Sequence, residues 1–323
     1  MGACAGSTIS GASCQASGDG LSNCGSASES CCTSLEVLGG TYYRTYDNDG
    51  SGATKEADPA TVSGFRLDKY DVTVGRFRQF VEIVLPAEGG VGWSPAAGSG
   101  IHGYLNGGLG LVNTANPGTF ESGWVTSNES VVAPTDANLT SQGGTWTSSP
   151  GSQENLPMTG ENWYEAYAFC IWDGGFLPSE AEWEFAAVGG NQQREYPWGS
   201  TAPGEGNQYA IYGDGNGNCY YPYDALADCN GVSNVAPVGT PTLGAGLWGQ
   251  LDLAGEAWEW VLDGFSSYAD PCINCGYLTD ASWQVIRGGA YYEPLTYILP
   301  AYRYRLYPHS RAGDTGFRCA RDP

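Results

Sequence analysis

The strongest candidate for chemistry in this 323-residue sequence is the segment LDLAGEAWEW, in which two acids flank a short loop. Asp252 and Glu259 can each offer a carboxylate. The backbone between them adds carbonyl oxygens from Leu253, Gly255 and Ala257. Oxygen ligands from a bent loop suit Ca²⁺, so the segment predicts a calcium site. The alternative is a capped helix end packed by Trp258 and Trp260.

A second candidate is an aromatic and charged segment near the C-terminal end of the sequence. Tyrosine and arginine dominate recognition sites, and arginine can hold a carboxylate, sulfate or phosphate through two hydrogen bonds. The candidate ligand-binding residues are Tyr291, Tyr292, Glu293, Arg303, Arg305, His309 and Arg311. The alternative is that the tyrosines pack in the core and the arginines hold buried loops through carbonyl groups.

Eleven cysteines form the third group. Clustered cysteines bind zinc or form disulfides. The five in the first 34 residues lack a C-x-x-C pair, and the later pair, Cys272 and Cys275, has no second pair to complete a zinc site. Disulfides are therefore favoured, with Cys272–Cys275 and Cys219–Cys229 as local pairs. The odd number leaves one thiol free, modified or intermolecular.

The composition restricts the partners and the compartment. Thirty-five acids against 13 bases give a net charge of −22. Binding to nucleic acid needs a basic surface, so nucleic acid is not an expected partner. The sequence has no run of about 18 apolar residues, and we expect no transmembrane segment. With its many cysteines, the chain is predicted to be secreted, periplasmic or at the cell surface.

Two short helices in the middle of the chain must position these groups. Asn162 and Ser179 are expected N-caps, and Glu165 and Glu182 complete a capping box in each case. Each helix ends at a pair of glycines. Earlier in the chain, Thr73 should cap a helix that ends at Pro86. Its expected apolar face is Phe77, Phe80, Val81 and Val84.

Strands are expected at residues 35–46, with a turn at Gly39-Gly40, and at residues 61–70. Residues 87–155 and 196–234 are rich in glycine, serine and asparagine, which is typical of long loops. Residues 1–34 contain almost no large apolar side chains, so we expect a disulfide-tied arm or tether. The main domain would then cover residues 35–323.

Six motifs, in this order along the chain, resemble the formylglycine-generating enzyme family, also called sulfatase-modifying factors. They are WYEAYAFC with LPSEAEWE at 163–184, YPWG at 196–199, APV at 236–238, LDLAGEAWEW at 251–260, RGG at 287–289 and GFRCA at 316–320. The resemblance implies an α+β domain with the loop-rich formylglycine-generating-enzyme variant of the C-type-lectin-like fold. The same family includes lectin-like scaffolds whose C-terminal loops bind varied ligands.

The resemblance also implies a disulfide and metal ligands. It pairs Cys170 with Cys319, and it places calcium at the segment that begins with Asp252. A second calcium site of the family would use the Ile211 and Val232 carbonyls and the Asn230 side chain. Asn230 stands where the family has an aspartate, so a charge is lost. A hydrogen-bonded loop without metal is the alternative at this second site.

The chain departs from the family at its catalytic motif. The resembling enzymes oxidise a substrate cysteine to formylglycine with oxygen and copper, and they use two cysteines shortly after the Arg-Gly-Gly turn. Cuprous copper prefers thiolate ligands. Ala290 and Glu293 occupy the family's serine and first cysteine positions, and no cysteine lies between Cys275 and Cys319. We therefore expect neither the family's catalytic residues nor bound copper.

The iron-dependent branch of the wider family needs three histidines, and this sequence has two, His102 and His309. We therefore predict a secreted or cell-surface binding or assembly protein, stabilised by calcium and disulfides, whose ligand is a protein, a glycan or another copy of the chain. The alternative is an oxidoreductase of the sulfatase-modifying type, or another metal-dependent enzyme with ligands such as Glu293 and His309.

Overall fold

The computed structural model describes residues 11–85, 92–223, 226–279 and 282–323. Its two central helices are α3 (Trp163–Trp172) and α4 (Glu180–Ala187). Each begins with a capping box, in which the N-cap side chain and the glutamate three residues later bond to each other's backbone N–H groups. The two predicted helices and their N-termini are therefore confirmed.

Helix α1 (Val74–Val84) also begins as predicted, since the Thr73 hydroxyl accepts a hydrogen bond from the backbone N–H of Arg76 at 3.2 Å. Its predicted apolar face is buried against α3, and the Phe77 and Phe169 rings stack with centroids 5.7 Å apart. The expected end of this helix at Pro86 lies outside the described residues.

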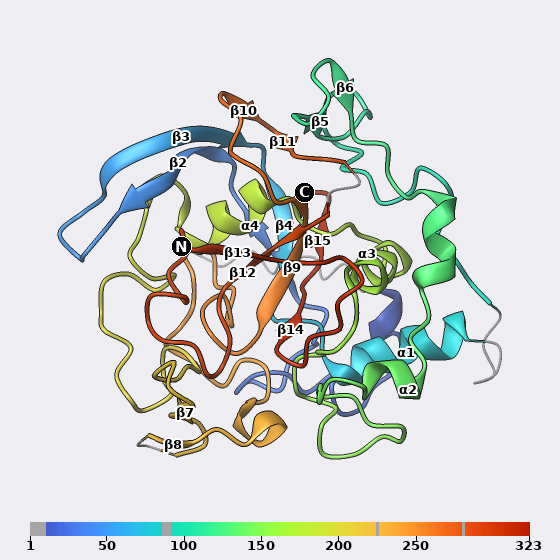
Figure 1. Cartoon of the computed structure of the whole chain (residues 1–323), viewed down its shortest axis with the longest axis vertical. Helices are drawn as coiled ribbons and strands as arrows, with labels where there is room; N and C mark the ends of the chain where they lie inside the picture. Colours follow the sequence, from blue (N-terminus) through green and yellow to red (C-terminus); the bar gives the residue numbers. More distant parts are fainter. Residues whose placement is uncertain (1–10, 86–91, 224–225, 280–281) are drawn as a thin grey trace.

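A four-stranded sheet at the centre of the molecule carries both candidate functional segments (Figure 1). Its strand order is β13 (Arg303–Leu306), β12 (Gln284–Arg287), β9 (Trp258–Gly264), β14 (Thr315–Gly316). Strand β12 runs antiparallel to β13 and β9, and β14 runs parallel to β9. All residues of β9 and β12 are buried, so both faces of these strands are covered.

Two three-stranded sheets share the predicted N-terminal strands. One contains β1 (Ser34–Val37), β4 (Phe65–Asp68) and β15 (Ala320–Arg321), and the other β10 (Cys272–Ile273), β3 (Thr54–Val62) and β2 (Gly40–Asp47). Each predicted strand is divided between the two sheets. The first division falls at Gly39, where a Cβ atom would lie 2.5 Å from the Val62 carbonyl oxygen. Only glycine allows so close an approach of two backbones.

The remaining elements are short. They are β5 (Val112–Asn113), β6 (Thr119–Phe120), β11 (Cys275–Gly276), β7 (Asn218–Cys219), β8 (Ala227–Asp228), η1 (Ala12–Cys14), η3 (Thr126–Val131), α2 (Asp136–Leu139), η4 (Gly190–Gln192) and η5 (Gly231–Asn234). Irregular backbone joins them, as the glycine-rich composition predicts. Among the described helices, none is both long and apolar enough to cross a membrane.

Aromatic side chains fill the two largest of the four hydrophobic clusters in the described chain. The first lies around α1 and α3, where Phe169 contacts Phe77, Phe80 and Phe317 at ring centroid distances of 5.7, 5.6 and 5.3 Å. The second lies around α4 and includes the fully buried Trp183. The central sheet contributes side chains to both clusters, so its position is fixed from two sides.

Five disulfides tie the described chain. The three expected pairs, Cys170–Cys319, Cys219–Cys229 and Cys272–Cys275, are all present. The first joins α3 to the segment before β15 across 149 residues of sequence, and closing so long a loop can stabilise a fold by roughly 4–5 kcal/mol. Two more pairs, Cys14–Cys32 and Cys24–Cys31, lie in the N-terminal arm. The eleventh cysteine, Cys4, lies outside the described residues.

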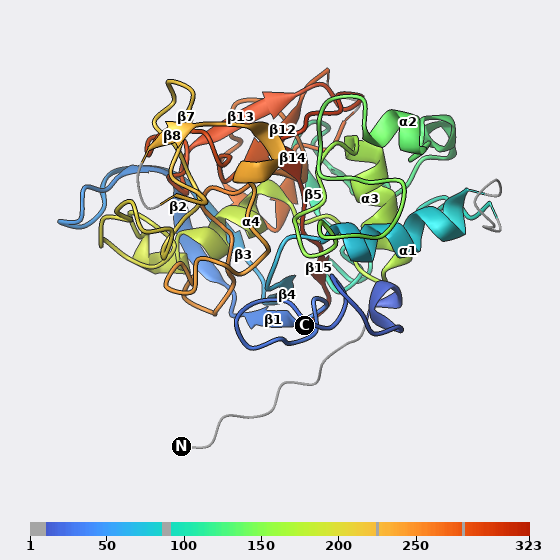
Figure 2. The same cartoon turned by 90° about the horizontal axis from the view of Figure 1, so that it is seen from below.

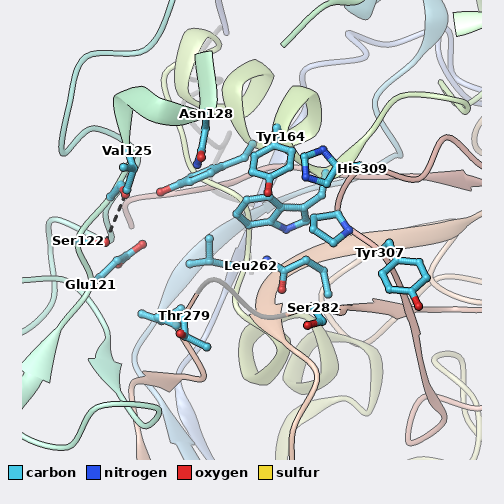
Figure 3. Close-up of a pocket in the computed structure, with 16 residues that line it drawn as sticks. Glu121, Ser122, Val125, Asn128, Tyr164, Leu262, Thr279, Ser282, Tyr307 and His309 are labelled. Carbon is cyan, nitrogen blue, oxygen red and sulfur yellow. Dashed lines mark hydrogen bonds between the residues drawn. The ribbon is translucent and has the colours of Figure 1, made fainter. Parts of the chain in front are cut away.

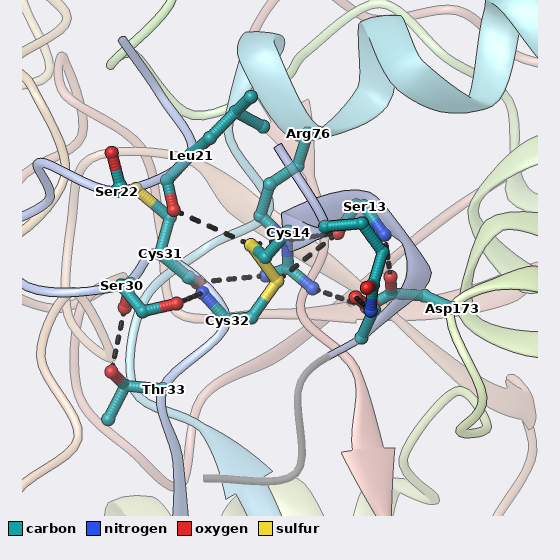
Figure 4. Close-up of a disulfide and its surroundings, with 12 residues drawn as sticks. Ser13, Cys14, Leu21, Ser22, Ser30, Cys31, Cys32, Thr33, Arg76 and Asp173 are labelled. Atoms are coloured by element: carbon teal, nitrogen blue, oxygen red, sulfur yellow. Dashed lines mark hydrogen bonds and ion pairs between the residues drawn. A yellow bond between two sulfur atoms is a disulfide. The ribbon is translucent and has the colours of Figure 1, made fainter. Parts of the chain in front are cut away.

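The described part of the N-terminal arm, residues 11–34, lies against the domain beside β1 and the C-terminal strand β15 (Figure 2). Figure 4 shows the Cys14–Cys32 disulfide beside the buried ion pair of Arg76 and Asp173. The Ser13 backbone N–H donates to Asp173 at 2.7 Å, and Arg76 donates to the Ser13 hydroxyl and the Cys31 carbonyl at 3.0 and 3.1 Å. Arg76 also pairs with Asp173 at 2.7 Å. The arm is therefore bonded to the domain through α1 and the end of α3.

Candidate functional site

A cavity of ≈310 Å³ opens beside the central sheet, and Glu293, the residue expected at the family's first cysteine position, is part of its lining. We call it the Glu293 pocket. Its functional side chains are Trp258, Tyr292, Glu293, Tyr297, Tyr304 and Asp314. Strands β9, β12 and β13 supply one wall, and the loop between β12 and β13 supplies Glu293. The pocket thus combines two carboxylic acids with several aromatic rings.

The two acids differ in their partners. Burial raises the pKa of Glu293, a hydrogen bond from Trp258 opposes that rise, and the nearby charge of Asp314 adds to it. The Tyr292 hydroxyl donates a short hydrogen bond to Asp314. Burial and the charge of Asp314 together raise the pKa of Tyr292, so the phenol remains protonated. Among the described residues, no arginine or lysine lines this pocket.

The Arg-Gly-Gly turn places Glu293 at the pocket. Gly288 and Gly289 have φ values of 94° and 78°, which favour glycine. Arg287 is fully buried, pairs with Glu184 at 2.5 Å and donates to the Tyr302 carbonyl oxygen at 2.6 Å. Beyond the turn, Ala290 is buried in the core, so it presents no group to the pocket. The backbone N–H of Glu293 donates to the Ala290 carbonyl at 3.0 Å.

Two of the predicted ligand-binding arginines form ion pairs within the fold. Arg303 contacts Glu180 at 2.7 Å, and Arg311 donates two hydrogen bonds to Glu165 at 2.5 and 2.6 Å. Both glutamates are buried, so these arginines neutralise interior charge. Arg305 is exposed and lies over two aromatic rings, 4.8 Å from Phe265 and 5.0 Å from Trp283.

The other predicted binding residues are divided between two places. The Tyr291 ring meets the Tyr292 ring edge-on at 5.1 Å, and the Tyr291 backbone N–H donates to Glu256 O at 3.0 Å. His309 lies away from the Glu293 pocket, against Tyr164 with ring centroids 5.0 Å apart. It lines a different and larger cavity. The structure therefore does not place Glu293 and His309 in one pocket.

The predicted calcium segment contains a buried charge cluster. Both carboxylate oxygens of Glu259 accept hydrogen bonds from Arg318, at 2.6 and 2.9 Å, and one also accepts from Trp183 at 2.9 Å. The Asp252 carboxylate accepts from the Gly239 backbone N–H at 2.8 Å. Burial raises the pKa of Asp252 to about 7, although Arg318 opposes the rise. Glu259 is thus fully engaged, whereas Asp252 is held only by the backbone.

Glu256 is a functional candidate that the sequence reasoning missed. One of its carboxylate oxygens accepts from the Ala236 backbone N–H at 2.6 Å, and the other is buried without a partner. Burial and the charge of Asp252 raise its pKa. Its backbone N–H donates to the carbonyl of Ile211 at 2.8 Å. Ile211, a predicted ligand of the second calcium site, therefore lies next to the segment predicted as the first calcium site. The position of Glu256 between Asp252 and Glu259, inside the predicted calcium segment LDLAGEAWEW, could have identified it as a further candidate ligand.

The other predicted ligands of the second site, Asn230 and Val232, form hydrogen bonds with residues close to them in the sequence. The Asn230 amide donates to the Asp228 carbonyl at 3.0 Å, and the Val232 carbonyl accepts from the Val235 N–H at 3.1 Å. Within the described part of the chain, no three His, Cys, Asp or Glu side chains form a group that could hold a metal ion. Any calcium here would therefore depend on backbone carbonyls and one or two carboxylates.

Comparison with known proteins identifies the family of the chain. Residues 23–323 match the sulfatase-modifying factor enzyme 1-like domain. Formylglycine-generating enzyme from Mus musculus is 29% identical over 278 residues, which cover 81% of this chain and 67% of that protein. Inactive C-alpha-formylglycine-generating enzyme 2 from Bos taurus is 30% identical over 300 residues, covering 88% of this chain and 87% of that protein.

The fold is shared with the solved structure of PvdO from Pseudomonas aeruginosa, with a TM-score of 0.53 at 17% identity over 90% of this chain and 94% of that chain. The expected α+β fold is therefore confirmed. The relatives include both a formylglycine-generating enzyme and an inactive one, so family alone does not decide between catalysis and binding. The chain belongs to the sulfatase-modifying factor enzyme 1-like, or formylglycine-generating enzyme, family.

Proposed function

We propose that this chain is a secreted or cell-surface, non-catalytic binding protein whose ligand enters the Glu293 pocket. The observation that carries the proposal is the chemistry of that pocket, which has a glutamate, Glu293, where the resemblance to the family leads us to expect a cysteine. All ten cysteines of the described chain are bonded in disulfides, and none lines the pocket. Without thiolate ligands, cuprous copper has no preferred partners there.

The pocket suits a cationic group on a protein ligand. Two acids without an arginine favour a positive charge, and the rings of Trp258, Tyr297 and Tyr304 can surround an ammonium or guanidinium group. The net charge of −22 would steer a basic partner towards the chain. A lysine or arginine side chain on a partner surface therefore fits the site best.

Binding can be tested with basic hexapeptides in which a single lysine or arginine is the only charged side chain. Intact protein should bind them by fluorescence polarisation, and peptides with norleucine or citrulline at that position should bind about tenfold more weakly. Glu293→Gln should weaken binding of the basic peptides by a similar factor. Glu56→Gln, which removes one exposed acid far from the pocket, is the matched control. Equal binding by the two variants would contradict the proposal.

The alternative function, an oxidoreductase of the sulfatase-modifying type, is supported by the relatives named formylglycine-generating enzyme. It can be tested with a cysteine-containing sulfatase peptide, copper and oxygen. We expect no aldehyde in the product peptide by mass spectrometry. Aldehyde formation that depends on the added protein would overturn the binding proposal.

We also propose that calcium stabilises the fold near Glu256. Asp71, Asp252, Glu256 and Glu259 form a group of four buried carboxylates, and the buried Arg318 interacts with three of them, Asp71, Asp252 and Glu259. Excess negative charge in an interior is costly unless a cation compensates it. Glu256, with its unpartnered oxygen, and Asp252 are the acids that would hold the ion. They would act together with the carbonyl groups of Leu253, Gly255, Ala257 and Ile211.

The calcium proposal predicts about one calcium ion per chain by elemental analysis, and a fall in Tm on treatment with EDTA that added calcium reverses. Glu256→Gln should abolish the response to EDTA.

The five disulfides of the described chain support an oxidising compartment. Assembly through the arm remains a proposal as well, and light scattering of the non-reduced protein would detect it.

A further inference from the structure

We propose that the chain has a second ligand site, separate from the Glu293 pocket, that takes a neutral saccharide. The site is a cavity of ≈710 Å³, within the size range of small-molecule sites. We call it the Gln284 pocket. Its described walls come from α3, residues 121–128, the strands β9 and β12, and residues 307–309 (Figure 3). The two pockets share no described lining residue, so neither proposal depends on the other.

An unpartnered acceptor in the wall points to a ligand. Gln284 is only 4% exposed, and its side-chain carbonyl oxygen has no hydrogen-bond partner. Strand pairing with Leu306 on one side and Gly264 on the other fixes the backbone of Gln284. Buried polar atoms in folded proteins are normally hydrogen-bonded. A ligand that donates an O–H or N–H group into the cavity would satisfy this oxygen.

The electrostatics of the walls favour a neutral ligand. Glu121 is the only acid among the described wall residues, and no lysine or arginine is among them. Both Glu121 oxygens are engaged by His102 Nδ1, at 3.1 and 2.9 Å. The second ring nitrogen of His102 contacts Glu182 at 2.9 Å. The two carboxylates raise the pKa of His102 to about 10 against the effect of burial, so the imidazolium compensates Glu121 at neutral pH.

Aromatic rings offer flat surfaces beside these polar groups. Tyr307 is 52% exposed and stacks on Trp283 at a centroid distance of 3.7 Å, which holds its ring in place at the rim. From the start of α3, Tyr164 meets Trp163 edge-on at 5.1 Å. The apolar C–H face of a sugar packs on such rings, while its hydroxyl groups can donate to Gln284 and bond to Ser282 and Asn128. A charged or wholly apolar ligand would leave one of these features unused.

The experiment uses the intact chain and four probes, the methyl glycosides of glucose, galactose, mannose and N-acetylglucosamine. Saturation-transfer NMR and titration calorimetry should detect binding of at least one of them at millimolar concentration. Gln284→Met removes the acceptor with little change of shape, and Tyr307→Ala removes the rim ring. Each should weaken binding about tenfold. Tyr43→Ala, which alters an exposed tyrosine on β2 that lines neither pocket, should leave saccharide binding unchanged.

The stability of the Gln284→Met variant shows whether a loss of saccharide binding comes from the missing acceptor or from a damaged fold. Because it removes an unpartnered buried polar group, its Tm should equal or exceed that of the original chain. Failure of all four glycosides to bind, or binding that neither Gln284→Met nor Tyr307→Ala weakens, would overturn the proposal. None of these results bears on binding of basic peptides at Glu293, which is measured separately.

Discussion

The buried Arg318 cluster and the Glu293 pocket lie at opposite ends of the short strand β14, and both gather carboxylates around the central sheet. In the Arg318 cluster, the guanidinium reaches Glu259 and Asp71, each at 2.6 Å. In the Glu293 pocket, Glu293 and Asp314 have aromatic donors and no described cation. Acids that pair with a buried arginine, such as Glu259 and Asp71, stabilise the fold, whereas acids without a cation, such as Glu293, are available to a ligand.

The largest effect should come from Arg318→Met. All N–H groups of this guanidinium point to Glu259, Asp71 or backbone carbonyls, as in its bond to Leu251 O at 2.9 Å. Removal of the cation leaves buried carboxylates without compensation, which costs roughly 3–5 kcal/mol. We expect a loss of that size in the free energy of unfolding, measured by urea denaturation.

The matched control is Arg305→Met, which removes an exposed arginine that lies over Phe265 and Trp283. Loss of its ring contacts should cost about 1 kcal/mol or less. If the two variants were equally stable, Arg318 would not be the structural cation of the cluster, and the contrast with the Glu293 pocket would lose its basis.

A smaller effect, of opposite sign, is expected for Asp252→Asn in calcium-free buffer. Burial raises the pKa of Asp252 to about 7 from its ordinary value of 3.8. The unfolded chain therefore releases the proton at lower pH than the folded chain, and stability falls as the pH rises from about 4 to 7. The asparagine variant escapes this loss, so it should be more stable than the original chain at pH 8, by on the order of 2 kcal/mol.

The two proteins should be similarly stable at pH 3.5, where Asp252 is protonated in both states. Thermal unfolding at both pH values measures the difference. Added calcium should reverse the order at pH 8, because the ion binds the carboxylate of the original chain. An Asp252→Asn variant that is less stable at pH 8 without calcium would show that the carboxylate is already compensated within the cluster.

Much of the fold was predictable from the sequence, because local signals determine it. The capping residues Asn162 and Ser179 identify both central helices, and the ordered motifs identify the family. The interruption at Gly39-Gly40 was predicted, and β1 and β2 are separated there. That these two strands belong to different sheets was not predictable, because it depends on the close approach of Gly39 to Val62, which is distant in the sequence.

The sites were less predictable than the fold. The sequence indicates that Arg303 and Arg311 could bind a ligand, but it does not show that Glu180 and Glu165 reach them from the N-terminal turns of α4 and α3. No sequence pattern identifies Gln284 as a binding residue, because the lack of a partner for its side-chain oxygen can be recognised only from the surrounding structure. Long-range ion pairing and burial therefore explain most of what the sequence reasoning missed.

In the Glu293 pocket, Tyr292→Phe should have a modest effect. It removes the hydroxyl that donates to Asp314 and leaves the ring in place. Loss of one such hydrogen bond costs about 1 kcal/mol, because Asp314 is only half-buried and water can replace the donor. Urea denaturation measures this cost. Tyr43→Phe, which alters a tyrosine on strand β2 outside the pocket, is the control. Equal stability of Tyr292→Phe and the original chain would show that water already satisfies Asp314.

The smallest change in stability is expected for Glu293→Gln, within about 0.5 kcal/mol, because the amide oxygen can still accept from Trp258 and the residue is half-buried. Its effect should appear in binding. The ionised carboxylate attracts a lysine peptide, and burial raises the pKa of Glu293 above its ordinary value of 4.5. As the pH falls, the original chain should therefore lose affinity at a higher pH than a solvated glutamate would. The glutamine variant should bind weakly with a flatter pH profile, and parallel profiles for the two proteins would exclude Glu293 as the group that holds the cation.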